Sequence, residues 1–73
     1  MNLEYDNQVD AAYISLAAVE PVDVKVSYAC DPDEVGGQIQ LDFDGDGRLI
    51  GIEVLDASHM LPEVVLKAHV SPK

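Results

Sequence analysis

The sequence is poor in basic residues and holds a single cysteine. Lysine and arginine together number 4 against 14 aspartates and glutamates, which gives a formal net charge of −10 at pH 7. Proteins bind phosphate backbones through lysine and arginine, so this balance argues against nucleic acid and anionic membranes as partners. A basic protein or a divalent cation suits the negative field better. Cys30 has no second cysteine to pair with in the chain, and a lone thiol is typical of a reducing compartment.

Long apolar runs are also missing. None approaches the roughly 20 residues that span a bilayer. The first ten residues, MNLEYDNQVD, are acidic and lack the apolar core of a signal peptide, so we expect a cytoplasmic protein. Apolar residues still make up 48% of the 73 residues, too many for a disordered chain, and residues 1–73 are expected to form a single small domain. Such a chain builds only a thin core, to which a homodimer would add burial.

Hydrophobic alternation predicts strands along the first half of the chain. Asn2 to Asp6 alternates, and Ala11 to Ala17 is apolar on both faces, as in a central strand. Val22 to Tyr28 alternates strictly, which is typical of a half-buried antiparallel strand. The segment from Cys30 to Gly37 is acidic and contains proline and paired glycines, so we expect a loop there.

The sequence also predicts a β-hairpin around Asp46-Gly47. Apolar residues alternate on both sides of the sequence DGDG, and a two-residue type I′ turn at Asp46-Gly47 fixes their register. Six apolar side chains then share one face of the sheet. The predicted cross-strand pairs are Phe43 with Ile50, Leu41 with Ile52, and Ile39 with Val54.

Turn and cap chemistry is expected from three aspartates. Asp6 and Asp10 bracket the first turn, where their carboxylates are expected to accept hydrogen bonds from backbone amides. Asp56 precedes a predicted helical turn that ends at Met60, and we expect its side chain to cap that turn. A second helix is predicted to begin at Pro62. Its apolar stripe is formed by Leu61, Val64, Val65 and Ala68.

The predicted fold class is therefore α+β: an antiparallel five-stranded β-meander with a short C-terminal helix packed on one face. Tyr13 and Leu49 are expected on the other face of the sheet, as is Glu53. That second face is where a partner would dock.

Two segments carry a resemblance. YDNQVDAAYISL near the start and DGDGRLIGIEVLDASHMLP later in the chain resemble a family of small bacterial proteins called domain of unknown function 2283. The resemblance extends over about residues 3 to 63. It implies a bacterial protein and carries no established activity. Because members of the family are thought of as neighbours of small toxin-like proteins, it suggests an antitoxin-like role.

The Asp-rich turn matches the pattern of a calcium-binding EF-hand loop. Asp42, Asp44, Asp46, Gly47 and Glu53 stand at the required positions. An EF-hand loop joins two helices, whereas the flanking alternation here predicts strands. The hairpin register sets Glu53 opposite Gln40, about three residue steps from the turn, too far to close a cage around an ion. What remains is a surface site for a divalent cation on Asp42, Asp44 and Asp46, or a turn that simply requires Asp and Gly.

No combination of residues in the sequence predicts catalysis. His59 has no evident partner that would make it a general base, and Cys30 lies beside carboxylates, which make it a poor nucleophile. The serines lack the context of a nucleophile. We therefore expect no enzyme and no cofactor.

Three functions remain in competition. The first is a non-enzymatic protein-interaction module, antitoxin-like, that masks a small basic toxin-like partner. The second is a self-associating structural homo-oligomer. The third is a divalent-cation binder that uses the turn from Asp42 to Gly47.

Overall fold

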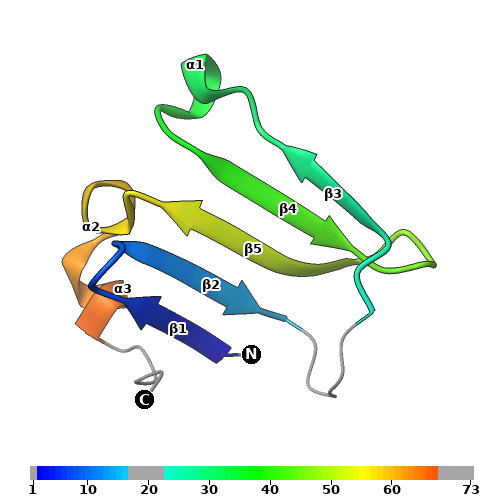
Figure 1. Cartoon of the computed structure of the whole chain (residues 1–73), viewed down its shortest axis with the longest axis horizontal. Coiled ribbons are helices and arrows are strands. Elements are labelled where there is room, and N and C mark those ends of the chain that lie inside the picture. Colours follow the sequence, from blue (N-terminus) through cyan, green and yellow to red (C-terminus); the bar gives the residue numbers. More distant parts are fainter. Residues whose placement is uncertain (1, 17–22, 68–73) are drawn as a thin grey trace.

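The described residues form one antiparallel sheet with three short helices (Figure 1). The computed structural model describes residues 2–16 and 23–67. Five antiparallel strands with short helices confirm the predicted α+β class. In chain order the elements are β1 (Asn2–Asp6), β2 (Ala11–Ser15), β3 (Val26–Ala29), α1 (Pro32–Val35), β4 (Ile39–Phe43), β5 (Leu49–Leu55), α2 (Ala57–Met60) and α3 (Glu63–Lys67).

The strand order refines the meander. Across the sheet the strands run β1-β2-β5-β4-β3, so β1 and β2 form one consecutive pair and β3, β4 and β5 form a second consecutive unit. β5 joins the two units, and β3 lies at the far edge instead of beside β2. The longest strand, the seven-residue LIGIEVL of β5, therefore takes the central position, where both of its edges are paired.

The third strand differs from its prediction. We expected a half-buried strand over Val22 to Tyr28, but β3 covers Val26–Ala29 and all four of its residues are exposed. Val22 lies outside the described residues. Alternation indicates which side chains share a face, but not whether other elements cover that face, and here β3 is an edge strand.

The β4–β5 hairpin confirms most of the predicted register. Leu41 pairs with Ile52 and Ile39 with Val54 as expected, but Phe43 pairs with Leu49 because a bulge shifts the register. The turn is also of another kind. Gly47 has a φ of 82° and its N–H donates to the carbonyl of Asp44, whereas a type I′ turn needs a second positive φ. A type I turn followed by a left-handed glycine satisfies the same sequence.

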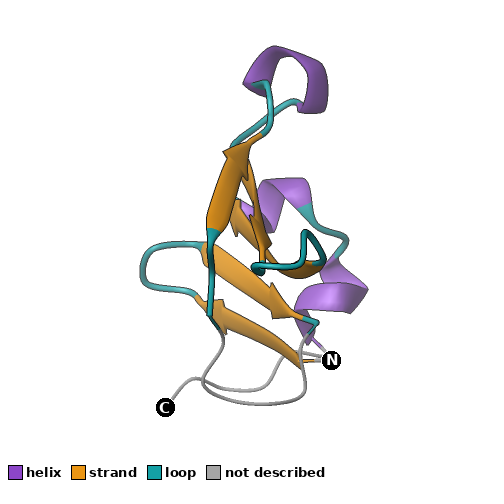
Figure 2. Ribbon diagram, turned by 90° about the vertical axis from the view of Figure 1, so that its right-hand side faces the viewer, coloured by secondary structure: helices purple, strands orange, loops and turns teal. Residues whose placement is uncertain are grey.

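The two C-terminal helical segments cover one face of the sheet (Figure 2). Ala12, Val54 and Ala57 form the buried cluster at this contact. No large side chain is fully buried within the described residues, which agrees with the thin core expected from length. The side chains that pack around the cluster are Leu3, Tyr5, Ile52, Met60, Leu61 and Leu66.

Two predicted segments need correction. In α3 the packing residue is Leu66, while Val64, expected in the apolar stripe, is 74% exposed; Ala68 lies outside the described residues. The expected loop from Cys30 to Gly37 contains α1. The Asp31 carboxylate caps this helix by accepting from the Asp33 N–H at 3.0 Å.

Asp10 attaches α2 to the first hairpin. Its carboxylate accepts hydrogen bonds from the Ser58 N–H at 2.9 Å and the Ser58 hydroxyl at 2.7 Å, and its carbonyl accepts from the Ala57 N–H. The Tyr5 hydroxyl donates to the same carboxylate at 2.7 Å. Asp10 therefore caps a helix that begins more than 40 residues later, the role that a side chain at the helix start usually fills.

This arrangement corrects two predicted roles and confirms a third. Asp10 bonds across to α2 and not to the amides of its own turn, and Asp56 makes no side-chain cap, since its backbone is left-handed with a φ of 55°. Asp6 does accept from the Gln8 N–H within the turn, as expected. Hydrogen bonds from Tyr5 and then from Ser58 lower the pKa of Asp10, and the same Tyr5–Asp10 bond raises the pKa of Tyr5.

Asp10→Asn should make the protein less stable at neutral pH, because the amide accepts these hydrogen bonds less strongly than a carboxylate. A lowered pKa stabilises the fold above the ordinary aspartate value of about 3.9, and this contribution is lost as the pH falls through the lowered pKa. The deficit in the free energy of unfolding should therefore be present at about pH 7 and shrink at about pH 3. Urea titrations measure it, with the exposed Asp33→Asn as control. An equal deficit at both pH values would contradict this role.

Candidate functional site

The face of the sheet opposite α2 and α3 is polar and acidic. Two rows of paired residues run across all five strands, and we call them together the polar face. The first row is Glu4, Tyr13, Glu53, Gln40 and Ala29. The second row is Asn2, Ser15, Gly51, Asp42 and Ser27. None of the five strands contains lysine or arginine, so no basic side chain on a strand balances these carboxylates.

Asp42 is the buried centre of this face. Only 7% of its surface is exposed, and its carboxylate accepts hydrogen bonds from the Tyr13 hydroxyl at 2.9 Å and from the Ser27 hydroxyl at 2.8 Å. These two partners supply the hydrogen bonds that a buried carboxylate requires. The network ties β2, β4 and β3 together across the face.

Tyr13 reaches Asp42 by crossing the central strand at a glycine. Gly51 of β5 lies between Ser15 and Asp42 in the second row. A Cβ built at Gly51 would collide with the ring and the hydroxyl of Tyr13. The absence of a side chain at Gly51 therefore creates the path along which the Tyr13 ring lies.

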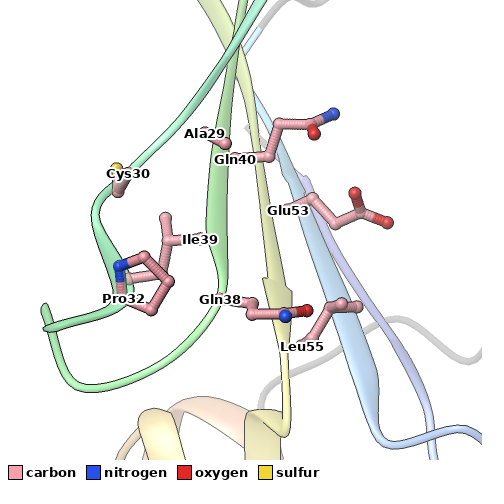
Figure 3. Close-up of a pocket in the computed structure, with 8 residues that line it drawn as sticks. All are labelled: Ala29, Cys30, Pro32, Gln38, Ile39, Gln40, Glu53 and Leu55. Atoms are coloured by element: carbon pink, nitrogen blue, oxygen red, sulfur yellow. The ribbon is translucent and has the colours of Figure 1, made fainter.

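Glu53 lies in the middle of the first row, between Tyr13 and Gln40. Its side chain is half-buried, and it forms no salt bridge within residues 2–16 and 23–67. Figure 3 shows Glu53 projecting to the same side of the strands as Gln40 and Leu55. Glu53 borders two hollows: one of about 300 Å³ that reaches Pro32 at α1, and one of about 260 Å³ that extends over β1 and β2 to Glu4.

The Asp-rich turn is organised by its own backbone. The Asp44 carboxylate accepts from the N–H groups of Asp46 and Arg48, at 2.9 and 3.0 Å. Asp42 lies on the polar face, outside the turn, where it accepts from the Tyr13 hydroxyl. Glu53 pairs with Gln40, as the register predicted. In the described part of the chain, no three side chains of the metal-binding types come together as a group. The EF-hand pattern therefore coincides with a hairpin turn, and Asp42, Asp44 and Asp46 do not converge.

The other predicted site residues are dispersed. Leu49 is 36% exposed at the bulge beside the turn, opposite Phe43, and does not join Tyr13 and Glu53. His59 is exposed on α2, where its N–H donates to the Asp56 carbonyl. Cys30 follows β3 and is only partly exposed.

The comparison with known families follows the same segments. A family model described as "Protein of unknown function (DUF2283)" matches residues 2–58. The chain belongs to the DUF2283 family. The matched part of the DUF2283 chain contains all five strands, and its last residue is Ser58, the partner of Asp10. No curated protein and no solved structure matches the chain. Within the described residues, the helices are all too short or too polar to span a membrane.

Sequence reasoning missed Ser27 and Gly51 as parts of the polar face. Ser27 lies on an edge strand, and its bond to Asp42 joins residues that are 15 positions apart. A signal for Gly51 was present, because a glycine inside a strand marks a close approach of another group. The sequence does not reveal that the approaching group is Tyr13.

Gly51→Ala should lower the free energy of unfolding by about 1 to 3 kcal/mol, because the added methyl forces the Tyr13 ring to move. The cost should fall in a Tyr13→Leu background, and a double-mutant cycle measured by urea unfolding gives the coupling. Gly45→Ala is the matched control, since a Cβ there meets the Lys25 side chain only at an ordinary 3.5 Å. Equal costs with and without Tyr13 would contradict the crossing.

Proposed function

We propose that this protein is a non-enzymatic protein-interaction module whose polar face receives a basic segment of a protein partner. The observation that carries the proposal is Glu53, a half-buried carboxylate without a salt bridge in the described residues, set between two hollows. A lysine or arginine side chain that enters either hollow would bring its charge to Glu53. The partner would contribute the cation that the strands of this chain lack.

The charge of the whole chain supports the same partner. A net charge of −10 attracts a basic protein during the encounter and makes the association sensitive to salt. In an antitoxin-like mode, the module covers the phosphate-binding surface of a small basic toxin-like protein. The carboxylates of the polar face then form salt bridges with the lysines and arginines that would otherwise contact phosphate.

The polar face suits binding better than acid–base chemistry. Neighbouring members of a row stand one strand apart, about 4.8 Å in backbone spacing, so the carboxylates of Glu4 and Glu53 are separated by Tyr13. Asp42 is engaged by two hydroxyls. A spread of charges across a sheet supports recognition of an extended basic segment over the positioning of one reacting bond.

Glu53→Gln should weaken the binding of an arginine-rich peptide about fivefold, since it removes one partly desolvated charge pair worth about 1 kcal/mol. Isothermal titration calorimetry measures the affinity at low and high salt. Glu34→Gln is the matched control, because it makes the same change of charge at an exposed position on α1.

The proposal is tested by comparing the loss of peptide affinity in the two variants. Binding that weakens equally in the Glu53 and Glu34 variants would show attraction to net charge alone and contradict a site on the polar face. Amide chemical-shift changes mapped onto Tyr13, Gln40 and Glu53 on addition of the peptide would support it. Changes confined to the helical side of the sheet would overturn it.

A further inference from the structure

The two edges of the sheet differ in chemistry. β1, at one edge, carries the carboxylates of Glu4 and Asp6, which discourage another strand from pairing there. β3, at the other edge, has the sequence VSYA and no charge. On β3, Val26 is 58% exposed and Tyr28 is 59% exposed. The β3 edge therefore presents apolar side chains without the protection that β1 has.

The backbone of β3 also has groups directed outward. The Cys30 N–H donates to the Ile39 carbonyl of β4. In the register of this pair, Tyr28 and Val26 lie two and four residues earlier, so their backbone groups also point toward β4. Because backbone groups alternate along a strand, Ser27 and Ala29 direct their N–H and C=O groups away from β4. Within the described residues no strand lies on that side of β3.

We propose that a second copy of this chain pairs antiparallel with β3, with the two-fold axis at Tyr28. Ser27 of each copy then opposes Ala29 of the other, and the outward backbone groups of both residues form hydrogen bonds across the axis. Two five-stranded sheets become one sheet of twice the width. This inference does not depend on the proposed function, since it uses the outward backbone groups of β3 and not the carboxylates of the polar face.

Other positions of the two-fold axis are excluded because they would require backbone groups that already form hydrogen bonds within the chain. An axis at Val26 or at Ser27 would set an outward-directed residue against Lys25, whose N–H already donates to the Phe43 carbonyl. An axis at Ala29 would set Ser27 against Asp31, whose carbonyl already accepts from the N–H groups of Glu34 and Val35. Only the axis at Tyr28 pairs Ser27 with Ala29.

Charge favours the same axis. With the axis at Tyr28, Lys25 of one copy lies near Asp31 of the other, so opposite charges meet at both ends of the new pair. With the axis at Ser27, Asp23 would oppose Asp31, and like charges would meet. The single lysine beside β3 thus offsets part of the repulsion between two chains that each carry a net charge of −10.

The apolar side chains of β3 gain partners in this dimer. Tyr28 of one copy faces Tyr28 of the other, and Val26 faces Cys30 of the second copy. Directly opposed aromatic and β-branched side chains stabilise antiparallel pairs. Burial of Val26 and Tyr28 also gives the thin core the added apolar contact that a chain of this size lacks.

Disulfide cross-linking between two copies can test the proposed pairing of β3 with β3. Val26→Cys places a thiol opposite Cys30 of the second copy in a pair without direct hydrogen bonds, where the Cα atoms are about 4.5 Å apart, within the range of a disulfide. In one chain the two thiols are four residues apart along a strand, about 13 Å, and cannot join. Val24→Cys is the matched control, because Val24 is exposed but would oppose Pro32.

Under mild oxidation the Val26 variant should form a covalent dimer whose disulfide joins position 26 to Cys30 between chains, as mapped by mass spectrometry, while the Val24 variant and the wild type stay largely unlinked. In light scattering, the wild type at micromolar concentration should show twice the mass of one chain. Ala29→Pro, which removes an N–H directed away from β4, and Tyr28→Lys, which opposes two like charges, should each restore the monomer mass.

Three results would overturn the inference: a monomeric wild type, equal cross-linking of the Val24 and Val26 variants, or a wild-type disulfide between two Cys30 residues, which requires another axis. Circular dichroism on Ala29→Pro and Tyr28→Lys confirms that their mass change is not unfolding. Arginine-peptide affinity of the Tyr28→Lys variant separates the two proposals, since Tyr28 belongs to neither row of the polar face.

Discussion

The Asp10 carboxylate holds α2 against the sheet, and the positions of the polar and apolar surfaces follow from that attachment. The carboxylate accepts from Ser58 and the Asp10 carbonyl accepts from Ala57, and these bonds fix where the chain turns after β5, so α2 and α3 pack over β1, β2 and β5. Within the described residues, the strand side chains that pack with these two helices come from β1, β2 and β5 and not from β3 or β4. The apolar side of β4 and β3 consequently keeps exposed side chains, and the polar face lies on the opposite side from both helices.

The central strand carries a second constraint. β5 is paired on both sides, so its side chains meet neighbours from β2 and β4. Gly51 leaves room above β5 for Tyr13 to reach Asp42, while Glu53, two residues along on the same face, has no comparable partner among the described residues. β5 therefore supplies both the glycine that lets Tyr13 reach Asp42 and the carboxylate on which the proposed binding depends.

The β4–β5 hairpin was predictable because alternation and turn residues act over a few positions. The pairs Leu41–Ile52 and Ile39–Val54 follow from the alternation, whereas the kind of turn and the bulge at Phe43 both differ from the prediction. The role of Asp10 was not predictable, since it depends on where Ser58 comes to lie, 48 residues away. The edge position of β3 was missed for a related reason: a strand's own sequence does not determine which strand lies beside it. Tyr13 and Glu53 were correctly placed on one face because that requires only their register.

Pairing of two copies at β3 and binding of a basic partner require different things of the net charge of the chain. A net charge of −10 would attract the proposed basic partner to the polar face but would repel a second copy of the chain. The carboxylates are arranged so that both demands can be met. Glu4, Asp42 and Glu53 lie on the polar face, whereas β3 carries no carboxylate and begins beside Lys25. Because the Debye length at physiological salt is about 8 Å, the repulsion between two copies is screened beyond the immediate contact, and the chemistry of the β3 edge decides whether they pair. A dimer joined through the backbone of β3 would leave Glu4 and Glu53 of both polar faces uncovered, so self-association and partner binding do not compete for the same carboxylates.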